Sequence, residues 1–234
     1  MSGPARTYLL DLSRENLLDW LDKDRTFVEI GVAEGAFSQE ILKRCRPSCL
    51  TLIDLWAHQE DPSYVPDVNN VPSQEQDARY QAVKDRFSGP NVSILRQDSL
   101  SAARCFADGS LDYIYIDAMH TFEAVTADLE AWWPKLADGG LLMGHDYANH
   151  IVALKSGFGV VEAVNKFVER TGCAFVGITR ENYPYPSYIL ARSWHQKALE
   201  IHDRADILGS FETGRMSWEL MPLPDGSIKI FPKF

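Results

Sequence analysis

The sequence has few cysteines and no long apolar run, and both absences narrow the classes of protein that it can encode. Its cysteines, at positions 45, 49, 105 and 173, form no C-x-x-C pair and no second cluster with zinc-ligand spacing. We therefore expect reduced thiols. No apolar run approaches the ~18 residues of a membrane-spanning helix, and residues 1–18 lack the long apolar segment and cleavage site of a signal peptide. These features predict a cytoplasmic protein without a membrane partner.

Positive charge is also scarce. The chain has 23 Lys and Arg against 33 Asp and Glu, a net charge of −10 and a pI of about 5.0. No stretch is rich in lysine or arginine, so we expect no nucleic-acid partner. Hydrophobic residues make up 45% of the 234 residues, which is enough for one substantial core.

Short apolar runs alternate with helical patterns along most of the chain. The expected strands are residues 26–31, 49–56, 91–97, 111–117, 139–147, 173–180 and 186–193. The expected helices are residues 13–21, 35–45, 73–87, 99–106, 121–136 and 160–172. Strands that are apolar on both faces and alternate with helices predict a mostly parallel sheet with helices on both faces. The predicted fold class is α/β, with a Rossmann-like seven-stranded sheet.

Three residues mark expected helix ends. Ser73 is placed to cap the helix that it begins. Pro134 should end or kink the helix that precedes it, and Gly172 should close the last predicted helix.

Two segments interrupt the alternation. Residues 57–73 are rich in proline, asparagine and aspartate, and a loop of this length inside a compact domain is more often functional than idle. The tail reads as a hairpin around Pro224-Asp225-Gly226. We predict one domain over residues 1–194. Residues 195–234 would be an extension that forms a lid or an oligomer contact, such as that of a homodimer.

The first of these predicted strands leads into a glycine-containing turn. Glu29 lies at the end of the strand, and Gly31 and Gly35 precede the next helix. Glycine permits a sharp turn and the close approach of a ligand, and a helix N-terminus offers free N–H groups to an anion. The spacing is not the G-x-G-x-x-G of dinucleotide-binding proteins, because Ala33 occupies the middle position.

Acidic and polar residues follow the next two strands. Asp54 closes the second strand, where an acid in an open α/β sheet can hydrogen-bond ribose hydroxyls. Asp98 and Ser99 follow the third strand, where the edge of a base would lie. Either residue would serve equally well as a simple cap of the helix that follows.

In these residues the chain resembles the class I S-adenosylmethionine-dependent methyltransferases, over roughly residues 25–192. It is most similar to the metal-dependent, macrocin O-methyltransferase-like enzymes that modify sugars and natural products. Residues 28–42 and 50–56 carry the superfamily match, and residues 109–147 carry the more specific one. The resemblance implies that Gly31 and Gly35 line the methionine part of S-adenosylmethionine, that Asp54 binds its ribose, and that Asp98 and Ser99 bind its adenine.

Two further strand ends carry groups that suit a divalent cation. Asp117 ends the fourth strand, and His145 and Asp146 end the fifth. Neighbouring parallel strands deliver their carboxyl ends to one edge of the sheet, so these groups should converge. Oxygen-rich ligation favours Mg²⁺ or a similar ion such as Mn²⁺. The alternative is that Asp117 contacts the cofactor only, without a metal.

The resemblance also implies roles for the histidines. Asp117 and Asp146 would bind the metal, and His120 would be the candidate base. We expect the positive end of the next helix and the neighbouring cation to keep His120 neutral. Where several relatives have a second acid, this chain has His145, which would bind metal, act through water or serve as the base. For His120 the plain alternative is a residue at the helix N-terminus that is bonded only locally.

The function implied is methyl transfer from S-adenosylmethionine to a hydroxyl of a sugar, polysaccharide or glycosylated metabolite. A divalent cation would orient and acidify the acceptor. Two alternatives stay open: a catalytically silent module that binds S-adenosylmethionine, and a metal-independent methyltransferase of small molecules. The glycine spacing argues against a nicotinamide-dependent oxidoreductase.

Overall fold

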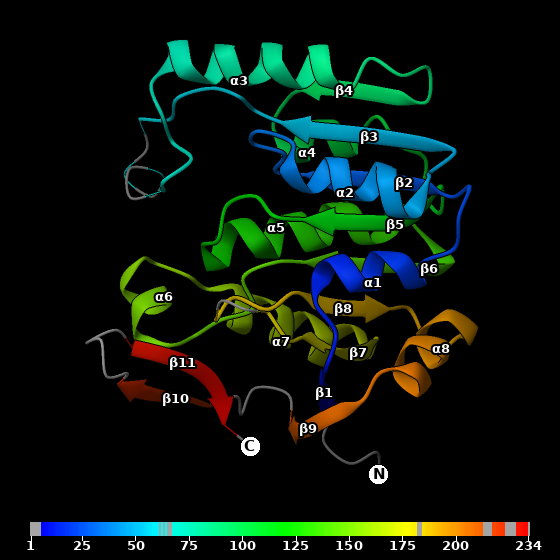
Figure 1. The fold of residues 1–234 in the computed structure, drawn as a ribbon, viewed down its shortest axis with the longest axis vertical. Coiled ribbons are helices and arrows are strands. Elements are labelled where there is room, and N and C mark those ends of the chain that lie inside the picture. Colours follow the sequence, from blue (N-terminus) through cyan, green and yellow to red (C-terminus); the bar gives the residue numbers. More distant parts are fainter. Residues whose placement is uncertain are drawn as a thin grey trace.

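The computed structural model describes residues 6–60, 62, 64, 67–181, 184–212, 217–222 and 228–233. Most of the described chain forms one nine-stranded sheet with helices on both faces (Figure 1). In spatial order its strands are β4 (Val92–Arg96), β3 (Cys49–Asp54), β2 (Thr26–Ile30), β5 (Leu111–Ile116), β6 (Leu136–Gly144), β8 (Tyr188–Ala191), β7 (Ala174–Thr179), β1 (Arg6–Leu10) and β9 (Ile207–Glu212). The predicted α/β class is therefore confirmed.

The sheet is mostly parallel, as predicted. The five strands from β4 to β6 pair in parallel, and β1 pairs in parallel with β7. Strand β8 is antiparallel to both of its neighbours, and β9 is antiparallel to β1. The parallel register brings the carboxyl ends of β2, β3 and β5 to one edge of the sheet.

The predicted number of seven strands is wrong, because two more strands extend the sheet beyond β7. Strand β1 is only five residues long and lies before the first strand that the sequence predicted, and β9 lies in the predicted C-terminal extension. These two strands pair across about 200 positions of sequence, with Thr7 opposite Phe211. The extension thus begins as part of the main sheet.

Helices cover the two faces of the sheet. They are α1 (Arg14–Trp20), α2 (Ala36–Cys45), α3 (Ser73–Arg86), α4 (Ser99–Ala103), α5 (Phe122–Trp132), α6 (Ile151–Lys155), α7 (Val160–Thr171) and α8 (Gln196–Arg204), with a short 3-10 turn at Trp133–Lys135. One hydrophobic cluster joins α1, α2, α3 and α8 to the sheet, and a second joins α4, α5 and α7 to it. Figure 1 shows α1 and α2 on the near face.

Most helix ends follow from local chemistry. The Thr121 side chain accepts a hydrogen bond from Ala124 N and so caps α5, and α5 stops at Trp132, two residues before Pro134, as predicted. Gly172 closes α7 in the left-handed conformation, also as predicted. The prediction of a Ser73 cap is wrong, since Ser73 is the first helical residue and Pro72 precedes it without a side-chain cap.

The predicted C-terminal hairpin is present as β10 (Ser217–Pro222) paired antiparallel with β11 (Ile228–Lys233). Its predicted turn, Pro224-Asp225-Gly226, lies outside the described residues. All four cysteines are free, as predicted. No helix in the described part of the chain is both long and apolar enough to span a membrane.

Candidate active site

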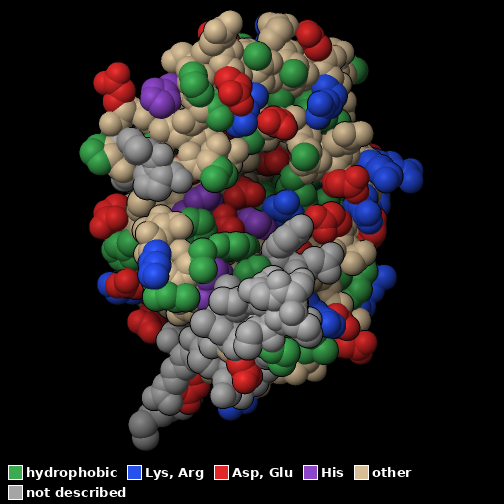
Figure 2. Space-filling model, turned by 60° about the vertical axis from the view of Figure 1, so that its left-hand side comes forward, with side chains coloured by type: hydrophobic (Ala, Val, Ile, Leu, Met, Phe, Trp, Pro, Cys, Tyr) green, Lys and Arg blue, Asp and Glu red, His purple; other side chains and the backbone are tan. Residues whose placement is uncertain are grey.

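A cavity of about 580 Å³ opens at the carboxyl ends of β2, β3 and β5. On this face, acidic and histidine side chains gather around a hollow (Figure 2). Most of the predicted cofactor residues line the cavity, namely Glu29, Gly31, Asp54, Asp98, Ser99 and Asp117. His120 lines it as well. The position of the cavity agrees with the rule that ligands of open α/β sheets bind at the carboxyl ends of the strands.

The two predicted glycines differ in their place. Gly31 has a φ of +87°, and a Cβ at this position would lie 1.9 Å from the backbone oxygen of Asp117. Only glycine therefore permits the close approach of the turn to the end of β5. Gly35 has a φ of +77° and is the N-cap residue of α2. A Cβ at this position would lie 2.5 Å from the Phe87 ring, and Gly35 is not among the cavity-lining residues.

Asp54 fixes the glycine turn. Its Oδ2 accepts hydrogen bonds from the backbone N–H groups of Val32 (2.9 Å) and Ala33 (2.8 Å), and its Oδ1 accepts one from Trp56 N (2.8 Å). Ala33 has a φ of +48°, which is unfavourable for a residue with a side chain. The carboxylate therefore holds a strained turn in place, and its predicted contact with ribose stays a prediction.

Asp98 and Ser99 have structural partners as well as a place at the cavity. Asp98 caps α4 by accepting from Ser101 N at 2.9 Å, and this hydrogen bond lowers the pKa of Asp98. Ser99 Oγ donates to Asp128 Oδ1 at 2.5 Å and accepts from Trp132 Nε1 at 2.8 Å. Burial raises the pKa of Asp128 to about 6. Sequence reasoning missed Asp128, which lies on the inner side of α5 among apolar residues.

Glu29 is the most deeply buried acid of the cavity floor, with 2% exposure. It accepts a hydrogen bond from Ser38 Oγ of α2. Burial raises the pKa of Glu29 to about 8, and the charges of Asp117 and Asp54 act in the same direction, while Ser38 and Arg14 oppose them. Glu29 is therefore protonated at neutral pH.

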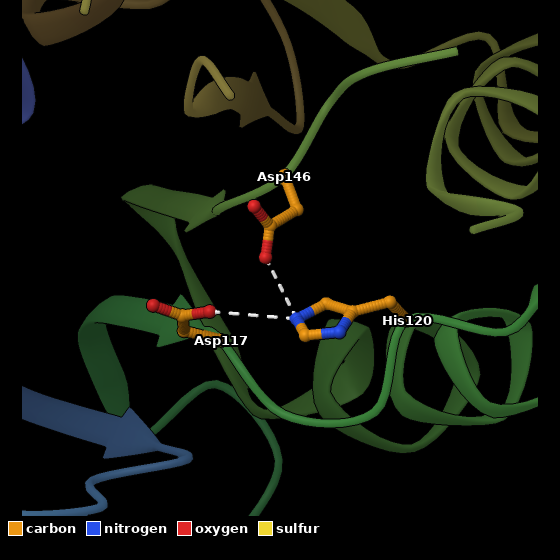
Figure 3. Close-up of side chains that lie close together, drawn as sticks. All are labelled: Asp117, His120 and Asp146. Atoms are coloured by element: carbon orange, nitrogen blue, oxygen red, sulfur yellow. Dashed lines mark ion pairs between the residues drawn. The ribbon is translucent and has the colours of Figure 1, made fainter. Parts of the chain in front are cut away.

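Two carboxylates and an imidazole meet beside the cavity (Figure 3). His120 Nε2 lies 2.7 Å from Asp146 Oδ2 and 3.7 Å from Asp117 Oδ1. One ligand atom from each of the three residues lies within 4.8 Å of the others. Asp117 follows β5, His120 lies in the loop before α5, and Asp146 follows β6 with a φ of +58°. The predicted convergence of the two strand ends is confirmed.

His145 lies near the other oxygen of each of these two carboxylates. Its Nδ1 lies 3.2 Å from Asp146 Oδ1 and 3.7 Å from Asp117 Oδ2, and it does not line the cavity. The group of three that suits a metal therefore contains His120, whereas the sequence had placed His145 there with Asp117 and Asp146.

The carboxylates control the charge of both histidines. Burial alone lowers the pKa of His120, but Asp117 and Asp146 more than offset this and raise it to about 10. The pKa of His145 is raised as well, against its burial, and the pKa of Asp146 is held low by the two histidines despite its burial. The two acids thus favour a protonated His120. The neutral His120 expected beside a bound cation stays a prediction. Thr121, not His120, caps α5.

The donor set fits a divalent cation. It offers two carboxylates and one imidazole, which suit Mn²⁺ at least as well as Mg²⁺. The buried His120 Nε2 has no aligned hydrogen-bond partner among the described residues, although Asp146 Oδ2 is close. An imidazole nitrogen that is near two carboxylates but aligned with neither fits a cation held by all three side chains.

Sequence reasoning missed one further residue of the cavity, Arg14. It is the first residue of α1, and its guanidinium lies over the Phe37 ring at 4.7 Å, beside Asp117. No local pattern marks an arginine next to a helix cap as a site residue, because α1 reaches the cavity only through the packing of the fold.

Comparisons with solved structures show which fold this is. A methyltransferase from Aquifex aeolicus, described as SAM dependent, matches 77% of this chain and 90% of its own, with 14% identity and a TM-score of 0.53. The trans-methyltransferase CalH, solved with SAH, matches 75% of this chain at 12% identity and a TM-score of 0.52, and this chain spans only 54% of its length. A protein from Corynebacterium glutamicum matches 78% of this chain and 81% of its own, with 18% identity and a TM-score of 0.50.

At these low identities the likeness shows the fold alone, which this chain shares with structures described as methyltransferases. No curated protein matches the chain significantly. A family model described as "Methyltransferase domain" matches residues 28–147, which is more than half of the 234 residues and includes the glycine turn and the carboxylate–histidine group. The chain therefore belongs to the methyltransferase-domain family.

Proposed function

We propose that this protein transfers a methyl group from S-adenosylmethionine to a hydroxyl of a sugar, polysaccharide or glycosylated metabolite, with the help of a divalent cation. The observation that carries the proposal is the junction of two sites. The cavity at the glycine turn continues to Asp117 and His120, which also belong to the group suited to a metal. A methyl donor in the cavity and an acceptor at the cation would be neighbours.

The chemistry is a displacement at the methyl carbon. A lone pair of the acceptor oxygen forms the C–O bond while the C–S bond breaks, so that S-adenosylhomocysteine leaves and the hydroxyl proton must pass to a base. Asp117, His120 and Asp146 would hold a divalent cation, which would lower the pKa of the acceptor hydroxyl and orient it. The protein supplies position, and holding donor and acceptor in line can contribute several of the roughly 7–11 kcal/mol available to proximity.

The two histidines take different parts in this proposal. His120 lines the cavity and lies nearest the carboxylates, so it either completes the metal group or accepts the proton. His145 lies off the cavity and contacts the same carboxylates, so it acts as a positioning residue. The manganese affinity of His120→Ala separates these two roles. If His120 is a metal ligand, the variant should lose manganese binding. If His120 is the base, the variant should keep manganese binding and lose most of its kcat.

The rim of the cavity favours a polyhydroxylated acceptor. Gln59, Asn69, Asn70 and Gln76 line it together with Tyr64. Hydrogen bonds fix several of these amides: Asn70 Oδ1 accepts from Gln59 N, and Gln76 Nε2 donates to Asn69 O. The amide groups that are not used within the chain supply donors and acceptors that match the hydroxyls of a carbohydrate.

The test is the formation of S-adenosylhomocysteine with a panel of glycosides and nucleotide sugars, in EDTA and after addition of Mn²⁺ or Mg²⁺. We expect turnover to stop in EDTA and to return with metal. Asp146→Asn should lower kcat by about 10²-fold or more, while Asp138→Asn, at a fully exposed site, serves as the matched control. Full activity in EDTA would show that methyl transfer does not require a divalent cation.

A metal-independent methyltransferase is the second candidate. It is favoured by the ion pairs that already neutralise the carboxylates, between Asp117 and Arg14 at 3.4 Å and between Asp146 and His120 at 2.7 Å. In that case the same panel would be methylated equally well with and without EDTA.

A further inference from the structure

We infer that Arg14 binds the carboxylate of the methionine part of S-adenosylmethionine. This inference rests on the proposed use of that cofactor and assigns its amino-acid end to a residue of α1. The starting observation is one of charge, because Arg14 is the only lysine or arginine among the described residues that line the cavity.

The other charged groups of the cavity are nearly all acids. They include Glu34, Asp54, Asp67, Asp98, Asp117 and Asp128. S-adenosylmethionine carries two positive groups, the sulfonium and the ammonium, and one negative group, the carboxylate. An acidic cavity attracts the positive groups and repels the carboxylate. The carboxylate therefore requires a local cation, and only Arg14 supplies one with a permanent charge.

Both the start of α1 and the Arg14 side chain are held in position. Ser13 caps α1, and the backbone N–H of Arg14 donates to Glu181 Oε1 at 2.9 Å. The guanidinium lies 4.7 Å from the centre of the Phe37 ring, a distance at which a cation is attracted to the ring face. Its side chain is 25% exposed, so it is largely desolvated but open to the cavity.

The guanidinium still has unused hydrogen-bonding capacity. Its contacts with Glu15, Tyr115 and Asp117 are 3.3, 3.5 and 3.4 Å long, which is longer than a strong charged hydrogen bond. Within the described chain, Nη2 makes no hydrogen bond. A planar guanidinium with free N–H groups is suited to bind a carboxylate through two parallel bonds.

The neighbours of Arg14 fit the rest of an amino acid. Arg14 Nη1 contacts Asp117 Oδ2, and the backbone oxygen of Asp117 meets the turn at Gly31. A cation and a set of acceptors thus lie side by side at the turn where the methionine part is expected. This pairing is complementary to the carboxylate and ammonium of a zwitterion.

Calorimetry with three ligands tests the assignment. These are S-adenosylhomocysteine, its decarboxylated analogue, which keeps the amine, and 5′-methylthioadenosine, which lacks both groups. In Arg14→Met we expect S-adenosylhomocysteine to bind about 10- to 100-fold more weakly, the range for losing a charged hydrogen bond. The decarboxylated analogue and 5′-methylthioadenosine should keep their affinities within about 2-fold. Arg14→Lys should retain part of the affinity.

The matched control is Arg180→Met, which removes an exposed guanidinium paired with Asp11 outside the cavity. It should bind all three ligands like the wild type. Equal weakening of all three by Arg14→Met would show that Arg14 only shapes the site, and no weakening of S-adenosylhomocysteine would also overturn the inference. If the wild type does not bind S-adenosylhomocysteine, that result would instead contradict the proposed function on which the inference rests.

Discussion

Replacing Glu29 with glutamine should change how the stability of the protein depends on pH. Glu29 is 2% exposed, and its pKa is raised to about 8 from an ordinary value of 4.5. The folded protein therefore keeps this proton up to about pH 8, whereas the unfolded chain releases it near pH 4.5. Between these values the unfolded chain binds fewer protons, so the free energy of unfolding falls as the pH rises. Glutamine resembles the protonated acid and has no proton to lose.

The magnitude follows from the two pKa values. At about 1.4 kcal/mol per pH unit, the wild type should lose about 4 kcal/mol through Glu29 between pH 5 and pH 9. Roughly a third of this loss falls between pH 7 and pH 9. Glu29→Gln avoids the loss, so the difference in free energy of unfolding between variant and wild type should grow by these amounts as the pH rises.

Urea denaturation of the metal-free protein at pH 5, 7 and 9 measures this difference. Asp128→Asn is a control, because the pKa of Asp128 is raised only to about 6 by burial. Its gain over the wild type should be nearly complete by pH 7 and should not grow further by pH 9. A difference between Glu29→Gln and wild type that stays constant from pH 5 to pH 9 would show that the pKa of Glu29 is not raised.

Two other substitutions test how the cavity is built. Gly31→Ala should destabilise the protein by about 3 kcal/mol or more in urea unfolding, since the φ is +87° and the new Cβ would lie 1.9 Å from a backbone oxygen; a loss below about 1 kcal/mol would mean that the turn moves freely. Ser99→Ala should cost about 1–3 kcal/mol, because it removes the partner of the buried Asp128 carboxyl and of Trp132 Nε1, and an unchanged unfolding midpoint would contradict those hydrogen bonds.

The part of the fold that was predicted from sequence is the part with local signals. Strands such as Leu111–Ile116 are apolar on both faces, and turn or helix-cap residues follow them, so their ends and the groups at those ends could be placed. β1 and β9 could not be placed in this way. Each becomes a strand through pairing with a distant segment, as Thr7 does with Phe211.

The same division holds for the site. Asp117 and Asp146 were expected together because parallel strands share an edge, and they meet there. The choice between His120 and His145 depended on side-chain direction in two loops, which spacing does not specify. Arg14 depended on the packing of α1 against the sheet. Gly35 leaves room for the Phe87 ring, because a Cβ there would lie 2.5 Å from it, and its contact with the cofactor stays a prediction.

A crystal structure with S-adenosylhomocysteine and Mn²⁺ bound is the most direct test of the proposed function. We predict density for the ligand in the cavity at the glycine turn. An anomalous manganese peak should lie between the side chains of Asp117, His120 and Asp146. Ligand bound elsewhere, or a cavity that holds ligand while no manganese lies at these three residues, would contradict the account of a metal-assisted methyl transfer.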